Sequence, residues 1–302
     1  MEQTMQPNQT DTGVLARLSE ELAHATAIIA PFIVRVDDGT RFTASGVSLG
    51  GGYIVGASHA VESDDVSVIT ADGTRHAATL IGRDADTDIV LLKVEADLAA
   101  APTATVMPRT GELALAVARP GEMGLTATLG VVSQVQETET DGNAEYIVST
   151  DAALYPGFSG GALVAAGGAM IGLLNRLYGR GAGVALGVPL VLRVAEYLKA
   201  HGTKRPGYLG VRTQLVALPD NLRTSQNIPQ TRGLLVVSVQ PGSAAETAGL
   251  FLGDTLLAIN GSPVEDVDAL RHHLVAGETI TITALRGGAT ATVTATVAGT
   301  ES

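Results

Sequence analysis

The sequence predicts a mostly β chain with two domains, the first of which folds as two six-stranded barrels. Short apolar runs follow one another from residue 32 to residue 189, with turn residues between them. Glycine is abundant, at 36 of 302 residues, and aromatic residues make up only 3%, a composition that suits short strands better than long helices. With 45% hydrophobic residues, the chain can form two separate cores.

The first domain is expected to span residues 12–201, after a polar tail at residues 1–11 that we expect to be disordered. Its first element is a helix, because apolar residues recur at helical spacing from Leu15 to Ile29, and Pro31 should end it. The first set of six strands is expected at residues 32–36, 41–49, 53–57, 66–70, 77–82 and 89–94. The second set is expected at residues 113–118, 126–136, 146–150, 161–164, 170–175 and 183–189.

A helix at residues 190–201 closes this domain, and the polar segment 202–207 is expected to be a linker. Residues 208–299 then form an independent module of apolar strands separated by turns that contain proline and glycine. We expect a helix near residues 264–275 and a final pair of strands in this module.

Ser159 is the candidate nucleophile, because it lies in a glycine-dense turn between two apolar runs. Gly157 and the pair Gly160-Gly161 flank it, and glycine lets the backbone aim successive N–H groups at one oxygen. Such a turn can form an oxyanion hole. A serine hydroxyl is a weak nucleophile without a base, however, so this prediction requires a histidine and a carboxylate elsewhere in the chain.

His59 and Asp88 are the candidates for those two roles. His59 follows an apolar run that is expected to be a buried strand. Asp88 is the last acid before the apolar run 89–94, and is therefore the acid expected to be buried, whereas Asp84 and Asp86 are expected to be turn residues. Each residue alone is more often structural. The order His59, Asp88, Ser159 makes a catalytic triad the better interpretation.

Six motifs between residues 44 and 211 occur in one order, within a match that runs from about residue 15 to about residue 299. They are Ala44-Ser45-Gly46-Val47, Ser58-His59-Ala60-Val61, Thr87-Asp88-Ile89-Val90-Leu91-Leu92-Lys93-Val94, Thr150-Asp151-Ala152-Ala153, Gly157-Phe158-Ser159-Gly160-Gly161-Ala162-Leu163 and Arg205-Pro206-Gly207-Tyr208-Leu209-Gly210-Val211. On these motifs the chain resembles the HtrA/Deg family of chymotrypsin-like serine proteases that carry a C-terminal PDZ domain.

The resemblance implies a trypsin-like double β-barrel at residues 12–201 and a PDZ domain at residues 208–299. It implies a serine endopeptidase of unfolded or misfolded proteins that needs neither ATP nor a cofactor. His59 is expected to act as the base, Asp88 to orient it, and Ser159 to attack the substrate. The N–H groups of Gly157 and Ser159 are expected to hold the oxyanion.

The sequence departs from the family pattern in three places near the triad. Ala57-Ser58 stands where relatives usually have two asparagines, Phe158 where they have asparagine, and Ala162 where they have proline. A fourth departure is Ala118-Arg119-Pro120-Gly121, in place of a glycine-asparagine-proline turn. We expect the Phe158 ring to lie beside the substrate and to affect access to the cleft.

The specificity pocket is expected to involve Leu173, Leu174 and Asn175 together with the loop at residues 177–186. These residues bring no acid, so we expect a small or medium apolar residue before the scissile bond.

The resemblance also implies a peptide-binding site in the second module. The segment Tyr208-Leu209-Gly210-Val211 is expected to receive the terminal carboxylate of a peptide on backbone N–H groups. The peptide is expected to add to the strand edge that begins at Val211. Side chains on one helix face are expected to line its pocket: Val267, Leu270 and Leu274.

Composition excludes several other functions. The formal charge of −12 disfavours nonspecific nucleic-acid binding, and the absence of cysteine excludes disulfides, thiolate catalysis and cysteine-based metal sites. His272-His273 has no evident third ligand, so we expect a solvated helix face and no metal site. The amino terminus lacks the features of a secretory signal, and no apolar run is long enough to span a bilayer.

These features leave the compartment open. The chain is expected to be cytoplasmic if it is full length, and periplasmic or extracytoplasmic if a leader was removed. Family members often form trimers through aromatic residues near the start of the protease domain, where this chain has only Phe32 and Phe42. The family resemblance nevertheless suggests a homo-trimer.

Two alternatives to the protease interpretation remain at this point. Residues 157–161 also match the G-x-S-x-G pattern of α/β-hydrolases. That reading is disfavoured because residues 162–164 resemble a strand and because the histidine and the acid precede the serine. The stronger alternative is a noncatalytic peptide-binding protein or chaperone with a protease fold, in which Phe158 or a collapsed cleft prevents acylation.

Overall fold

The structure is a computed structural model that describes residues 12–40, 43–63, 65–140, 143–175, 183–203, 205 and 207–299. The chain divides into two compact units, residues 1–203 and residues 204–302. The segment expected to be a disordered tail, residues 1–11, lies outside the described residues. In the part of the chain that is described, no helix is both long enough and apolar enough to cross a membrane.

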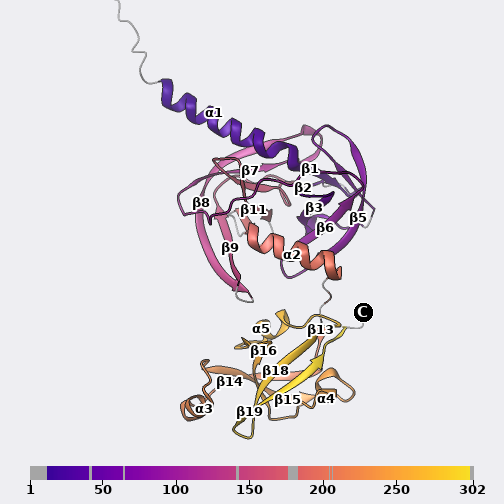
Figure 1. The fold of residues 1–302 in the computed structure, drawn as a ribbon, viewed down its shortest axis with the longest axis vertical. Coiled ribbons are helices and arrows are strands. Elements are labelled where there is room, and N and C mark those ends of the chain that lie inside the picture. The colour runs from indigo at the N-terminus through magenta and orange to yellow at the C-terminus, as the bar shows by residue number, and fades with distance from the viewer. Residues whose placement is uncertain are drawn as a thin grey trace, which may run out of the picture. The chain divides into compact units, whose positions relative to one another are not determined.

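The first unit contains two closed six-stranded barrels, which confirms the predicted fold class (Figure 1). The first barrel has the strand order β1-β2-β3-β6-β5-β4. Its strands are β1 (Ile33–Asp37), β2 (Ala44–Gly50), β3 (Tyr53–Ala57), β4 (Val66–Ile69), β5 (Arg75–Asp84) and β6 (Ile89–Val94). The second barrel has the order β10-β11-β12-β9-β8-β7. Its strands are β7 (Leu113–Ala118), β8 (Thr126–Thr140), β9 (Asn143–Thr150), β10 (Ala162–Ala165), β11 (Met170–Asn175) and β12 (Gly183–Gly187).

Strand β6 shows why the apolar runs are nearly continuous. Successive side chains of a strand point to opposite faces. Ile89 and Leu91 join a cluster that also contains residues of the second barrel, whereas Val90 and Leu92 fill the first barrel. Both faces are buried, so a continuous apolar run marks a strand that holds the two barrels together.

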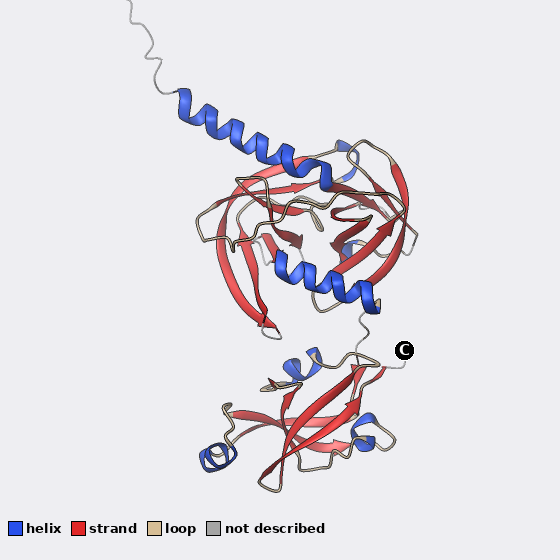
Figure 2. Ribbon diagram, in the orientation of Figure 1, coloured by secondary structure: helices blue, strands red, loops and turns tan. Residues whose placement is uncertain are grey.

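The α-helices of the first unit lie outside the barrels (Figure 2). Helix α1 (Thr12–Ile29) begins three residues before the apolar stripe that predicted it and leads into the short 3-10 turn Ala30–Phe32. Helix α2 (Val188–His201) begins two residues earlier than predicted, because Pro189 is tolerated in its first turn. Both helices contribute buried side chains to the cluster that the two barrels share.

The second unit has a sheet of order β14-β15-β16-β18-β19 with short helices around it. Its elements are β13 (Gly207–Tyr208), β14 (Val211–Ala217), α3 (Asp220–Gln226), β15 (Arg232–Val239), α4 (Ala244–Thr247), β16 (Thr255–Ile259), β17 (Ser262–Pro263), α5 (Val267–His272), β18 (Thr279–Arg286), β19 (Ala289–Thr296) and β20 (Ala298–Gly299). Helix α5 is shorter than predicted because the Asp266 side chain caps its start by accepting the Ala269 N–H. Helix α3 was not predicted.

An ion pair between the buried Asp254 and the partly exposed Arg286 stabilises the second unit. Asp254 is 1% exposed, and both of its carboxylate oxygens accept hydrogen bonds from Arg286, at 2.8 and 2.7 Å. The Phe251 N–H donates to the same carboxylate at 2.8 Å. Burial opposes ionisation of Asp254, but the bonds from Arg286 and from Phe251 outweigh it and hold the pKa of this carboxyl below its usual value of 3.8.

This lowered pKa predicts acid sensitivity of the second unit. Unfolding in acid takes up a proton at Asp254, so its stabilising contribution is complete above pH 3.8 and is lost as the pH falls toward the folded-state pKa. We expect hydrogen-exchange protection of residues 249–259, measured in the full chain, to decline over this range. The Asp254→Asn variant should lack this decline, and an equal decline in both proteins would contradict the assignment.

Candidate active site

The structure brings the three predicted triad residues together at one site. His59 Nε2 lies 3.2 Å from Ser159 Oγ, and His59 Nδ1 lies 2.5 Å from Asp88 Oδ2. An ionised carboxylate only accepts hydrogen bonds, so the Nδ1 proton faces Asp88 and Nε2 is free to accept the proton of Ser159. Asp88 is 4% exposed and Ser159 is 8% exposed, whereas the His59 side chain is 32% exposed.

Backbone contacts fix His59 and Asp88 against each other. His59 lies in the 3-10 turn Ser58–Ala60 that follows β3, and Asp88 lies between β5 and β6 with a positive φ of 56°. The Asp88 carbonyl accepts the Ser58 N–H at 2.8 Å, and Asp88 Oδ1 accepts the His59 N–H at 2.7 Å. Aspartate tolerates the left-handed region better than most residues. Asp84 Oδ1 accepts the Asp86 N–H at 3.0 Å, a local bond typical of a turn. Asp84 is nevertheless the last residue of β5 and, at 4% exposed, is as buried as Asp88, so the predicted difference in burial is wrong.

Asn175 supplies a contact to the triad that the sequence did not predict. Its Nδ2 donates to Asp88 Oδ2 at 2.9 Å, the same oxygen that His59 Nδ1 contacts. Asn175 is 0% exposed. This residue was expected in the specificity pocket, but its amide instead helps to orient the carboxylate that orients His59.

Leu173 and Leu174 also differ from the pocket that the sequence predicts. Both side chains are 0% exposed and belong to different core clusters. Strand β11 is buried along its whole length, so its side chains offer no surface to a substrate. Of the loop expected to complete the pocket, residues 177–182 lie outside the described residues.

The segment Tyr155–Gly161, which we call the oxyanion loop, presents two unused donors beside Ser159. The carbonyls of Gly157, Phe158 and Ser159 all accept hydrogen bonds. Within the described residues, the N–H groups of Gly157 and Ser159 have no acceptor. Gly157 has a φ of 88° and Gly160 a φ of 82°, values that glycine adopts without strain. These two N–H groups are the ones that the sequence assigns to an oxyanion hole, and they are not engaged by another group of the described residues.

The Phe158 side chain lies in the core, which corrects its expected place beside the substrate. It is 1% exposed and packs within the second barrel, in a cluster that includes Val148 and Leu163. Tyr155 contacts the ring edge to face, with 5.7 Å between centroids. A phenyl ring makes no conventional hydrogen bonds, so the Phe158 side chain holds its part of the loop by apolar packing.

The predicted peptide-binding residues of the second unit lie in the segment that leads into β14 and on helix α5. Gly210 has a φ of 84°, and no acceptor for the N–H of Leu209 or Gly210 occurs in the part of the chain that is described. Strand β14 begins at Val211 and is an edge of its sheet. Val267 is 39% exposed, whereas Leu270 is 5% exposed and packs in the core of this unit.

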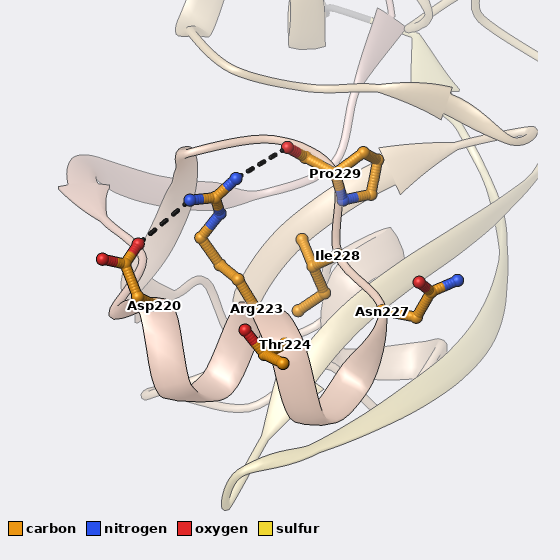
Figure 3. A pocket seen from close by; sticks show the side chains of 6 residues that line it. All are labelled: Asp220, Arg223, Thr224, Asn227, Ile228 and Pro229. Carbon is orange, nitrogen blue, oxygen red and sulfur yellow. Dashed lines mark hydrogen bonds and ion pairs between the residues drawn. The ribbon is translucent and has the colours of Figure 1, made fainter.

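A separate pocket lies beside α3 in the second unit and contains none of the predicted site residues. Its lining is Asp220, Arg223, Thr224, Asn227, Ile228 and Pro229 (Figure 3). Arg223 donates to the Asp220 carboxylate and to the carbonyls of Pro229 and Gln230. The Arg223 guanidinium is therefore engaged in holding α3. None of the triad residues lines this pocket.

Comparison with family models gives one match in each unit. Residues 44–173 match the trypsin-like peptidase domain, and residues 207–297 match the PDZ domain. The first match contains all three triad residues.

Two curated relatives that match most of this chain are periplasmic serine proteases by name. The probable periplasmic serine protease do/HhoA-like of Haemophilus influenzae is 33% identical over 257 residues, which cover 78% of this chain and 53% of that protein. The periplasmic serine endoprotease DegP of Escherichia coli is 30% identical over 250 residues, which cover 78% of this chain and 52% of that protein. This chain thus spans about half the length of these relatives.

Solved structures match the chain almost completely. The HtrA-type protease AlgW with tripeptide is 30% identical with a TM-score of 0.67, and the match covers 93% of this chain and 98% of that one. The serine endoprotease from Yersinia pestis is 28% identical with a TM-score of 0.69, at the same coverage of 93% and 98%. The chain therefore belongs to the HtrA/Deg family of serine proteases, with a trypsin-like peptidase domain and one PDZ domain.

Proposed function

We propose that this chain is an ATP-independent serine endopeptidase that cleaves unfolded or misfolded polypeptides. The observation that carries the proposal is the hydrogen-bonded series from Asp88 through His59 to Ser159. The two unused N–H groups of the oxyanion loop support it further. The triad contacts fit the roles of a nucleophile, a base and an orienting acid, and the two N–H groups are available to act as the oxyanion hole that we propose.

The proposed reaction proceeds in two halves. Ser159 Oγ attacks the scissile carbonyl while its proton passes to His59 Nε2, and the N–H groups of Gly157 and Ser159 hold the oxyanion. The C–N bond then breaks and His59 returns the proton to the leaving amine. Water then attacks the acyl carbonyl while His59 Nε2 takes its proton. The ester C–O bond breaks and His59 returns the proton to Ser159 Oγ, which releases the acid product. Asp88 accepts the Nδ1 proton of His59 throughout and stabilises the imidazolium each time it forms.

We propose an apolar residue of small or medium size before the scissile bond. Leu154 immediately precedes the oxyanion loop, and a methyl group added at Gly183 would lie 3.0 Å from its Cδ1 atom. Leu154 and Gly183 bring no acid that would select lysine or arginine.

We propose that the PDZ domain binds peptide C-termini at the segment Tyr208–Val211. The carbonyls of Leu209 and Gly210 are held by the N–H groups of Ala245 and Gln240, both at 2.8 Å, which leaves the N–H groups of this turn to a carboxylate. The open edge of β14 can then pair with the extended peptide. This binding would tether substrates or regulate the protease domain.

We propose that the protein works outside the cytoplasm, because the relatives are periplasmic by name.

We also propose a homo-trimer formed through the N-terminal part of the first unit, where α1 leaves Val14 and Leu15 more than 70% exposed. Sedimentation velocity would distinguish a trimer from a monomer.

Casein hydrolysis combined with fluorophosphonate labelling tests the proposed activity. Reduced casein is incubated with the protein, with and without a peptide that binds the PDZ domain, and the products and the labelled residue are identified by mass spectrometry. We expect cleavage after apolar residues and a label on Ser159, both absent from the Ser159→Ala variant. Cleavage after lysine or arginine would refute the apolar pocket.

The same experiment distinguishes the protease from the alternative, a noncatalytic protein. Absence of cleavage and of label, in the presence as well as the absence of the peptide, would favour a noncatalytic peptide-binding protein or chaperone. The buried position of Phe158 removes one reason for that alternative, because its ring does not occupy the cleft.

A further inference from the structure

Ser45 links the first barrel to the oxyanion loop of the second. It lies on β2, is 0% exposed, and contacts two residues of the loop. Its Oγ donates to the Gly157 carbonyl at 2.7 Å, and its N–H donates to the Ser159 carbonyl at 3.0 Å. Gly157 and Ser159 are the two residues whose N–H groups form the proposed oxyanion hole.

The direction of the Ser45 hydroxyl is fixed by a third contact. The Arg119 N–H donates to Ser45 Oγ at 2.9 Å. A hydroxyl has one proton, and an incoming donor takes a lone pair, so that proton points at the Gly157 carbonyl. The Arg119 guanidinium is itself held by the carbonyls of Ile33, at 2.6 Å, and Ala30, at 3.1 Å.

These contacts hold two peptide planes of the loop. The Gly157–Phe158 unit is bonded at its carbonyl by Ser45 and at its N–H by the Tyr155 carbonyl, at 3.1 Å. The Ser159–Gly160 unit is bonded at its carbonyl by Ser45 and at its N–H by the Leu174 carbonyl, at 2.8 Å.

The two N–H groups without an acceptor belong to the neighbouring peptide units. The Ser159 N–H is in the Phe158–Ser159 unit, which lies between the two held units, and the Gly157 N–H is in the Pro156–Gly157 unit, which precedes them. Because each peptide unit is planar, fixing the neighbouring planes restricts the direction of both free N–H groups. Gly160 adds to this restriction, because a Cβ atom there would lie 2.1 Å from the Ser45 carbonyl oxygen.

We propose that Ser45 is a positioning residue for transition-state stabilisation, holding the oxyanion hole in its working geometry from the opposite barrel. The proposal rests on the serine endopeptidase activity proposed above. None of the hydrogen bonds described for Ser45 joins it to the nucleophile's Oγ or to the imidazole. Its loss should therefore weaken binding of the oxyanion in the transition state more than binding of the substrate.

The test compares Ser45→Ala with Ser48→Ala in the full chain. Ser48 is a matched control, because it lies on the same strand, is 2% exposed, and donates its hydroxyl to the Ala99 carbonyl at 2.8 Å. Both variants lose one buried hydroxyl-to-carbonyl bond, but only one of these bonds reaches the oxyanion loop. Ser45→Thr, which keeps the hydroxyl, tests rescue. If Ser45→Ala does not fold, Ser45→Cys replaces it, because its thiol fills the space but donates weakly.

We expect Ser45→Ala to lower kcat by about 10- to 100-fold with KM within about twofold, since loss of an oxyanion donor itself lowers kcat by about 100- to 1,000-fold. Ser48→Ala should leave both constants within about twofold, and Ser45→Thr should restore most of kcat. The substrate is a quenched fluorescent peptide that contains a cleavage site mapped in casein. An unchanged kcat in Ser45→Ala, or an equal loss in Ser48→Ala, would overturn the proposal.

Hydrogen exchange separates this result from failure of the proposed activity. The peptide that spans residues 154–161 should exchange faster in Ser45→Ala than in the wild type, and should be unchanged in Ser48→Ala. This readout needs no hydrolysis, so it still reports on the loop if the wild-type protein proves inert. Unchanged exchange in Ser45→Ala would show that Ser45 does not hold the loop.

Discussion

Replacing Ser159 with alanine is expected to lower kcat for peptide hydrolysis by about a million-fold, and replacing Asp88 with asparagine by about ten-thousand-fold. Alanine removes the atom that forms the acyl bond. Asparagine at position 88 presents an amide donor to His59 Nδ1, 2.5 Å from the present oxygen. The imidazole proton then moves to Nε2, the atom that must accept the proton of Ser159.

Steady-state hydrolysis of the mapped casein peptide measures both effects. Asp84→Asn is the matched control, because Asp84 is 4% exposed and its Oδ1 accepts only a turn N–H from Asp86 among the bonds described; its kcat should stay near that of the wild type. The double variant Ser159→Ala, Asp88→Asn should be no slower than Ser159→Ala alone, since the triad acts as a unit. Multiplied losses in the double variant would contradict a shared mechanism.

The barrels and the candidate triad could be predicted because their signals are local. The runs 53–57, 89–94, 113–118 and 170–175 match observed strands at both ends, since each is apolar on both faces and bounded by turn residues. His59 and Asp88 could be placed at the ends of such runs. Strand β8 extends to Thr140, beyond its predicted end at residue 136, because its pairing with β9 continues through a segment that is polar on both faces.

The contacts that sequence reasoning missed join distant segments. Asn175 follows an apolar run and donates to Asp88, which is 87 positions away in the sequence. Ser45 bonds to Gly157 across 112 positions. In both cases the residue type is compatible with many partners, and only the closure of the barrels selects one. The N-cap Asp266 gave a local signal that was available, because aspartate before an apolar helix marks its start.

Phe158 shows the limit of inference from a residue's neighbours in sequence. Its position beside Ser159 suggested a ring in the cleft, but adjacent residues of a tight loop can point in opposite directions. Ser159 faces His59, whereas Phe158 enters the core of the second barrel. Burying a ring of this size stabilises the fold more than exposing it at the cleft would.

Replacing Phe158 with alanine is accordingly expected to destabilise the protease domain by about 3–5 kcal/mol, the range for removal of a buried phenyl ring. Phe158→Leu refills much of the volume and should cost about 1–1.5 kcal/mol. Tyr155→Ala removes only the edge contact of a side chain that is 54% exposed, and serves as the control. The free energy of unfolding of all three variants is measured by urea denaturation. Hydrogen exchange of residues 162–175 is used as the signal, so that the PDZ domain does not contribute.

Activity then distinguishes the two possible positions of the ring. If Phe158 anchors the oxyanion loop from the core, the alanine variant loses stability and hydrolyses the peptide more slowly, because Gly157 and Ser159 on either side are less well held. A ring that blocked the cleft would give the opposite pair of results, with unchanged stability and faster hydrolysis. Since the side chain is 1% exposed, we expect the first pair, and the second would require a different conformation of the loop.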